Sequence, residues 1–315
     1  MREVLSLTVP FFGLIFFGFL FGKILKKPAA GLEWLNTFIL YLALPALFFQ
    51  LVSQTPFEEL SNLGFILAVL ASTSAIFVIG FAFGLLRSRG SVRHATIKAL
   101  IGAYANNGYL GPGLAISALG TAATVPVALI FAFENTMFFI ITPVLMALAG
   151  GGNGGALVTA RRIVTRIFTH PFILAVIAGG LAAAFAWEPP EMVDRFLTML
   201  RGAAAPCALF AMGVTVALQP PPERDAVGDL SLFLTIKLLV HPLMAFALVS
   251  TVTVEPLWLT TAILMAALPP ATNVFVLATQ YRTDVEGASN AVLVGTAVSA
   301  VTVTAVLYAI KQGVL

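Results

Sequence analysis

The sequence predicts an all-α integral membrane protein with ten transmembrane helices. They form two inverted five-helix repeats, and the fourth and ninth helices are broken. Composition is the first observation: 59% of the 315 residues are hydrophobic, 10% are charged, and the mean hydropathy is +1.00. The second is a series of apolar runs near the length of roughly 20 residues that crosses a bilayer. The third is a pair of helix-breaking motifs, one in each half of the chain.

Ten apolar runs are long enough to span a membrane. The expected ranges are 4–24, 33–54, 61–86, 97–119, 123–149, 167–187, 193–218, 231–253, 257–280 and 287–310. Twelve Lys and Arg residues flank these runs on one side and four on the other, so the positive-inside rule places both termini outside the cytoplasm. Basic residues beside a membrane do not indicate nucleic-acid binding, and we expect a multi-pass protein of the cell membrane.

The two halves of the chain share short motifs at nearly constant spacing. Residues 8–11 recur at 169–172, and residues 45–49 align with 206–210, both at an offset of 161. Because each half holds five spans, an odd number, the two repeats must have opposite orientations in the membrane. The expected organisation is a first repeat at 1–149, a cytoplasmic linker at 150–166 and a second repeat at 167–315.

The fourth and ninth spans contain residues that interrupt a helix. The expected breaks lie at Gly111, Pro112, Pro269 and Pro270. Proline removes a backbone donor and crowds the preceding turn, while glycine permits non-helical dihedral angles. Lipid cannot satisfy the freed backbone groups, so a break at mid-depth must be buried in protein or line a cavity. In transporters such paired breaks form the substrate site.

The residues around these breaks are suited to binding an anion. The predicted substrate-binding residues are Asn106, Asn107, Gly108, Thr272 and Asn273. Half-helices that begin near Gly111 and Asn273 present unpaired N–H groups and about half a positive charge. Asparagine amides add donors for a carboxylate, or carbonyl oxygens for a cation. The alternative is that these asparagines only satisfy the backbone freed by the breaks.

Three ionisable residues lie deep in apolar sequence, namely Glu134, Lys237 and His241. A charge at mid-membrane costs about 2.5–3.5 kcal/mol, so such residues rarely lack a role. Glu134 and Lys237 either pair with each other or neutralise a helix end, and Glu134 alternatively carries a coupled proton. His241 shares a helical face with Lys237 and is expected to be packed and hydrogen-bonded, with a proton relay as the alternative. The sequence contains no metal-ligand cluster and no nucleophile motif, so it predicts no enzyme, metal or cofactor.

These motifs resemble those of the auxin efflux carrier family. The segment 106–111 is similar to the signature Asn-Thr-Gly-Tyr/Phe-Leu-Gly, with Asn107 in place of threonine. The segment 268–278 resembles Pro-Pro-Ala-Ala-Asn-Val-Phe, and 237–243 resembles the family's Lys-Leu-Leu span. The resemblance covers essentially the whole chain. Bacterial members are similar to permeases for malate, malonate and related carboxylates.

The resemblance implies that the broken fourth and ninth helices cross. Spans one, two, six and seven would form a scaffold, and spans three to five and eight to ten a mobile transport domain. The implied function is a secondary transporter that binds a small organic anion at the crossover. It would work by alternating access, with an elevator-like motion and possible coupling to H⁺ or Na⁺. The short linker is unlike that of the plant carriers and favours a bacterial inner-membrane protein, with a homodimer plausible through the scaffold. The alternatives are a sodium-coupled transporter of the bile acid symporter type and a non-transporting membrane receptor.

Overall fold

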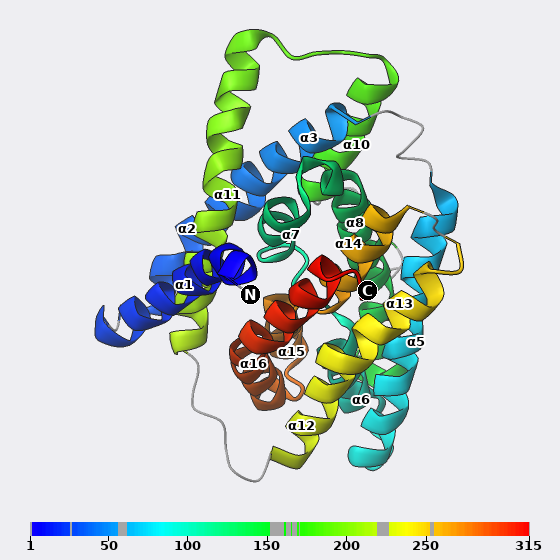
Figure 1. The fold of residues 1–315 in the computed structure, drawn as a ribbon. Helices are drawn as coiled ribbons and strands as arrows, with labels where there is room; N and C mark the ends of the chain where they lie inside the picture. The colour runs from blue at the N-terminus through cyan, green and yellow to red at the C-terminus, as the bar shows by residue number, and fades with distance from the viewer. Residues whose placement is uncertain are drawn as a thin grey trace. The chain divides into compact units, whose positions relative to one another are not determined.

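The computed structural model describes residues 2–25, 27–55, 62–151, 161, 165, 169, 171–218, 227–252 and 255–314, which are predominantly helical (Figure 1). The chain divides into two compact units. The first unit comprises Met1–Leu63, Asn107–Ala132 and Phe168–Leu218, and the second comprises Gly64–Asn106, Phe133–Ile167 and Gln219–Leu315. Most of the expected linker at 150–166 lies outside the described residues.

The first unit contains α1 (Arg2–Leu25), η1 (Ala29–Leu32), α2 (Glu33–Phe38), η2 (Ile39–Ala43), α3 (Leu44–Ser53), α7 (Gly111–Leu119), η3 (Thr121–Ala123), α10 (Pro171–Ala184) and α11 (Glu191–Leu218). The second contains α5 (Leu63–Arg87, apart from its first residue), α6 (Val92–Ala103), η4 (Ala147–Gly151), α12 (Val227–Thr235), η6 (Ile236–Val240), α13 (His241–Val249), α14 (Pro256–Ala266), α15 (Thr272–Tyr281) and α16 (Val285–Lys311). Helix α8 (Thr124–Met146) begins in the first unit and ends in the second.

Seven helical segments among the described residues are long and apolar enough to cross a membrane. They are Thr8–Leu25, Ala30–Ser53, Leu63–Arg87, Thr121–Gly150, Glu191–Leu218, Gly228–Val249 and Val285–Lys311. The expected fourth and ninth spans fall short of this length because each is divided into two helices, α6 with α7 and α14 with α15. The expected sixth span is the 14-residue helix α10. The helical membrane character is confirmed, and the inverted ten-span repeat stays a prediction.

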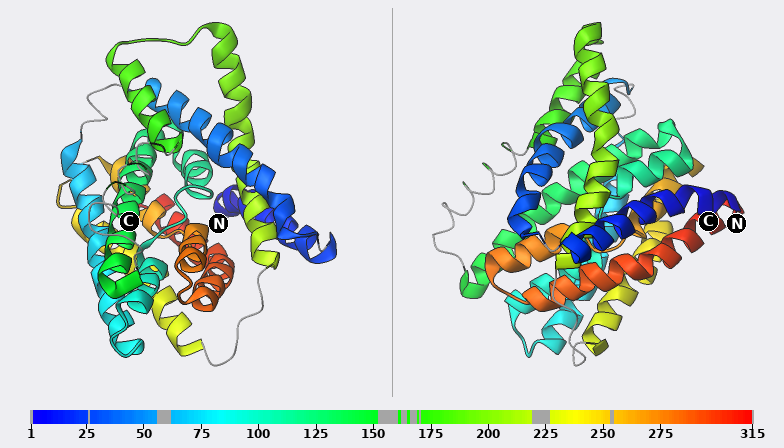
Figure 2. Two further views of the ribbon diagram at one scale, coloured as in Figure 1. Left: turned by 180° about the vertical axis from the view of Figure 1, so that it is seen from behind. Right: turned by 90° about the vertical axis from the view of Figure 1, so that its left-hand side faces the viewer.

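Glycines bring α1 and α11 close together in the first unit, where the two helices pack against each other (Figure 2). A Cβ atom on Gly18 would lie 2.2 Å from the backbone oxygen of Phe210. A Cβ on Gly213 would lie 2.0 Å from the backbone oxygen of Ile15. Small residues that let two backbones approach are typical of membrane helix pairs, so Gly18 and Gly213 act here in packing.

Substituting Gly213 with alanine is therefore expected to destabilise the protein. The added methyl group has to displace main-chain atoms of α1, and overpacking of this kind typically costs about 1–3 kcal/mol. Gly202→Ala is the matched control because it lies in the same helix and its Cβ would meet open space. Thermal unfolding in detergent measures both variants, and equal melting temperatures would contradict the close α1–α11 contact.

The second unit has an apolar core that surrounds the ends of its broken helices. Buried side chains from α5, α6, α8, α12, α15 and α16 form one cluster, which includes Tyr104 just beyond α6 and Ala271 just before α15. The π-helical turn η6 lies between α12 and α13, with Pro242 in the first turn of α13. Such π-turns inside helices often occur at functional sites, and this one carries Lys237.

Candidate functional site

The two predicted breaks meet in the second unit as a short antiparallel bridge between Ala105 and Pro270. Its two backbone hydrogen bonds, both 2.9 Å long, run from Asn106 N–H to Pro269 O and from Ala271 N–H to Tyr104 O. Backbone groups released by one break are thus satisfied by the other. This pairing allows non-helical chain to exist where no water is available, because a lipid environment cannot supply the missing partners.

Arg93 connects the start of α6 to the end of α15, at the ends of these helices that lie away from the bridge. Its Nη2 atom donates to the backbone oxygen of Tyr281, at 2.6 Å, and to Oγ1 of Thr283, at 3.1 Å. Arg93 lies in the first turn of α6, and Tyr281 is the last residue of α15. Helices α6 and α15 therefore run antiparallel and are joined at both ends, which fixes the position of the N-terminus of α15.

Polar side chains gather at that N-terminus. Asn273 Nδ2 donates to the hydroxyl of Tyr104 at 3.0 Å, and this hydroxyl donates to Oδ1 of Asn135. The Tyr104 ring stacks on Phe138, with centroids 4.4 Å apart. Oγ1 of Thr272 is buried and has no hydrogen-bond partner among the described residues. The first turn of α15 thus combines a partial positive charge with the Asn273 amide, which Tyr104 positions, and the Thr272 hydroxyl, which has no described partner.

The three predicted intramembrane ionisable residues also lie together in the second unit. Lys237 Nζ donates to the backbone oxygen of Ala266 at 2.6 Å and lies 2.9 Å from Nδ1 of His241. Thr73 Oγ1 lies 3.3 Å from Nε2 of His241 and donates to Oε1 of Glu134 at 2.5 Å. All four polar side chains are at most 3% exposed. Successive polar contacts link these four buried side chains in a row, which we call the Glu134–Lys237 chain.

One contact of Lys237 bears on the roles predicted for it. Ala266 is the last residue of α14, so the ammonium group satisfies a carbonyl at the negative end of a half-helix. This contact supports the predicted neutralisation of a helix end, while the role of Lys237 in coupling or in pairing with Glu134 stays a prediction. The described contacts connect Glu134 to Lys237 through Thr73 and His241. His241 is packed and hydrogen-bonded, as predicted.

The predicted substrate-binding residues are divided between the units. Asn106, Thr272 and Asn273 belong to the second, whereas Asn107 and Gly108 belong to the first. Asn106 and Asn107 are each 1% exposed. Helix α7 begins at Gly111 with Pro112 in its first turn, and α15 begins at Thr272, as the breaks predicted. That these residues line one site stays a prediction.

Sequence reasoning missed two residues that organise the second unit's polar groups. Tyr104 lies directly before the Asn-rich motif and joins Asn273 to Asn135. Thr73 connects Glu134 to His241. Tyr104 had a signal, since a tyrosine beside a break needs a partner for its hydroxyl when it is buried. Thr73 is one of many small residues in an apolar helix, and its sequence context gave no signal of this contact.

Comparison with known proteins shows similarity to membrane transporters along the chain. A family model described as "Membrane transport protein" matches residues 4–307. The chain is 49% identical to a Rhizobium meliloti protein named "Putative malonate transporter", over 100% of this chain and 98% of that one. It is 25% identical to an "Uncharacterized transporter" of Methanothermobacter thermautotrophicus, over 85% of each. It is also 24% identical to "Auxin efflux carrier component 8" of Arabidopsis thaliana, over 43% of this chain and 37% of that one.

Proposed function

Because this chain belongs to the membrane transport protein family, the family of the auxin efflux carriers, we propose that it moves malonate or a similar small carboxylate across the bacterial inner membrane. The chain is a membrane transporter and not an enzyme. Secondary transport by alternating access, with both termini outside the cytoplasm, is the mechanism we propose.

The observation that carries this proposal is the polar N-terminus of α15. A carboxylate oxygen accepts hydrogen bonds from amides, hydroxyls and N–H groups, and it is stabilised by the positive end of a helix. Asn273 is held by Tyr104, and the Thr272 hydroxyl has no described partner. The 49% identity to the Rhizobium meliloti protein named "Putative malonate transporter" supports a short dicarboxylate as the ligand.

Alternating access is supported by the division of the chain into two units. All described helices of the predicted scaffold spans lie in the first unit, as do residues 107–132 of the fourth and fifth spans. In transporters built from repeats, one group of helices moves as a largely rigid body against the other. We propose an elevator-like motion of the second unit, with the α6–α15 pair and the Glu134–Lys237 chain moving as one piece.

Uptake of radiolabelled malonate, malate and an indole carboxylate into proteoliposomes tests the function. We expect saturable malonate uptake, with malate weaker and the indole compound weakest. Imposed pH and sodium gradients identify the driving ion. Sodium-dependent uptake would favour the bile acid symporter type, in which asparagine carbonyls bind the ion. Saturable binding without flux would support a receptor and overturn the transport proposal.

We predict that Glu134→Gln abolishes accumulation driven by a pH gradient while leaving malonate counterflow intact. Glutamine retains an acceptor for Thr73 but cannot gain or lose a proton. Glu255→Gln, which alters an exposed carboxylate before α14, is the matched control. Both variants are reconstituted and assayed with and without the gradient. An unchanged response of Glu134→Gln to the gradient would remove Glu134 from proton coupling.

A further inference from the structure

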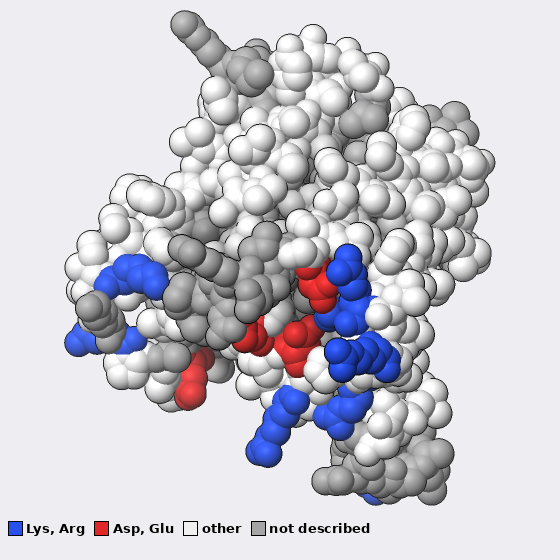
Figure 3. All heavy atoms as spheres, turned by 90° about the horizontal axis from the view of Figure 1, so that it is seen from below, with Lys and Arg blue, Asp and Glu red and all other residues white. Residues whose placement is uncertain are grey.

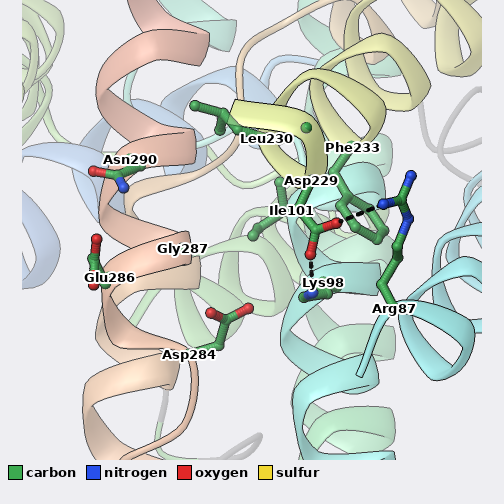
Figure 4. Close-up of a pocket in the computed structure, with 11 residues that line it drawn as sticks. Arg87, Lys98, Ile101, Asp229, Leu230, Phe233, Asp284, Glu286, Gly287 and Asn290 are labelled. Carbon is green, nitrogen blue, oxygen red and sulfur yellow. Dashed lines mark hydrogen bonds and ion pairs between the residues drawn. The ribbon is translucent and has the colours of Figure 1, made fainter. Parts of the chain in front are cut away.

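The second unit has a polar cavity of about 460 Å³ at one end of its helices (Figure 4). Two basic and three acidic side chains line it, together with Asn290. Figure 3 shows acidic and basic side chains next to one another on the part of the surface seen from below. The lining residues belong to the last turn of α5, to α6, and to the starts of α12 and α16. The candidate spans Leu63–Arg87, Gly228–Val249 and Val285–Lys311 end or begin beside these residues, which predicts a position at the edge of the hydrocarbon.

The charges of this cavity are unevenly compensated. Asp229 contacts both Lys98 and Arg87, the latter at 3.5 Å, so the two basic groups share one carboxylate. Figure 4 shows this group on the side of α5, α6 and α12, with Asp284 and Glu286 on the side of α16. Burial raises the pKa of the Asp284 carboxyl, and Lys98 partly opposes this effect. A ligand that fits both sides needs a negative group for the first and a positive group for the second.

The buried side chain of Asn290 is a second, independent indication of a ligand site. Its side chain lines the cavity and the residue is 1% exposed. Neither Oδ1 nor Nδ2 has a hydrogen-bond partner among the described residues, and Oδ2 of Asp284 is also buried without one. A buried polar group without a partner typically costs about 1–3 kcal/mol. A ligand with both a donor and an acceptor would satisfy the amide.

An apolar groove of about 330 Å³ begins beside this cavity and shares Leu230 with it. Its lining residues are Leu230, Ser231, Leu234, Thr235, Leu238, Leu239, Val294, Val298 and Thr302. Leu239 and Val298 are 54% and 42% exposed, so the groove is open to the surroundings of the helix. Residues 294–302 cover about 12 Å along α16, close to the depth of one hydrocarbon leaflet.

We propose that the cavity and the groove together bind one phospholipid whose headgroup carries a phosphate and a primary ammonium, as phosphatidylethanolamine does. The phosphate lies toward Lys98 and Arg87, the ammonium toward Asp284 and Glu286, and an acyl chain fills the groove. A primary ammonium offers three N–H donors, which a trimethylated choline lacks. A purely anionic headgroup would add to the excess of acidic side chains. The site lies in the second unit, separate from the α15 N-terminus proposed for the carboxylate.

Native mass spectrometry of the purified, delipidated protein tests this proposal with three added lipids of equal chain length. We expect phosphatidylethanolamine to bind roughly tenfold more tightly than phosphatidylcholine or phosphatidylglycerol. The double variant Asp284→Asn, Glu286→Gln should lose this preference, while Glu191→Gln, at an exposed carboxylate of the first unit, should keep it. Equal affinity of the wild-type protein for the three lipids would overturn the proposal.

The groove is tested separately from the headgroup cavity. Val298→Phe places a ring in the groove and should weaken phosphatidylethanolamine binding, whereas Val301→Phe, at a 73% exposed position outside it, should not. The soluble headgroup glycerophosphoethanolamine should bind far more weakly than the lipid. If it binds equally well, or if the two phenylalanine variants behave alike, the acyl-chain site is wrong. Malonate binding by the same variants should stay at the wild-type level, which distinguishes this site from the proposed substrate site.

Discussion

Replacing Asn273 with alanine is expected to weaken malonate binding by roughly 10- to 150-fold. A hydrogen bond to a charged group contributes about 1.5–3 kcal/mol, and this difference sets the fold-change. The alanine variant also leaves the Tyr104 hydroxyl without its donor from α15. Calorimetric titration of the detergent-solubilised protein measures the affinity. Because the backbone bridge is unchanged, the melting temperature should stay close to that of the wild type.

Two further variants separate binding from general damage. Gln280→Ala removes an exposed amide from the same helix and should retain full affinity. Tyr104→Phe keeps the ring that stacks on Phe138 but removes the hydroxyl that positions Asn273, so we expect an intermediate loss. Unchanged affinity of Asn273→Ala would place the carboxylate elsewhere in the protein.

Replacing Lys237 with methionine is expected to destabilise the second unit strongly. Methionine fills similar space but leaves the buried Ala266 carbonyl and His241 without their present partner. An orphaned buried acceptor costs about 1–3 kcal/mol, which corresponds to a melting temperature lower by roughly 2–12 °C. Thermal unfolding followed by the fluorescence of the tryptophans, including the buried Trp258, measures the change.

Lys27→Met is the control for this experiment, because Lys27 is exposed. This variant should have the same melting temperature as the wild type. Lys237→Arg keeps a positive donor but is longer and needs more partners, so it should recover only part of the lost stability. If Lys237→Met melts like the wild type, the ammonium group does not stabilise the end of α14, and a role in transport alone would explain its burial.

The positions of the helix breaks were predictable because they depend on local chemistry. Gly111 and Pro112 begin α7, and Pro269 and Pro270 separate α14 from α15. Proline and glycine impose these interruptions whatever the rest of the fold does. The burial of Lys237 was predictable for a similar reason, since an uncharged apolar run on both sides places it within the membrane.

The partners of these residues were not predictable from the sequence. Arg93 is one of the twelve basic residues that predict the orientation of the protein in the membrane. In the structure it also donates a hydrogen bond to the last residue of α15, 188 residues away. Thr73 contacts Glu134 across 61 residues of sequence. Apolar helices have few distinctive positions, so periodicity gives the lengths of elements but not which faces meet. Such long-range contacts appear only once the helices are packed.

The joining of α6 to α15 has a consequence for how this protein can change its cargo. The bridge beside the proposed site is built from main-chain atoms of Tyr104, Asn106, Pro269 and Ala271, and side-chain substitution leaves those hydrogen bonds in place. Thr272 and Asn273 can therefore be exchanged without dismantling the frame that presents them. We therefore expect that substitutions at the start of α15 alter the substrate preference and leave the main-chain hydrogen bonds of the bridge in place.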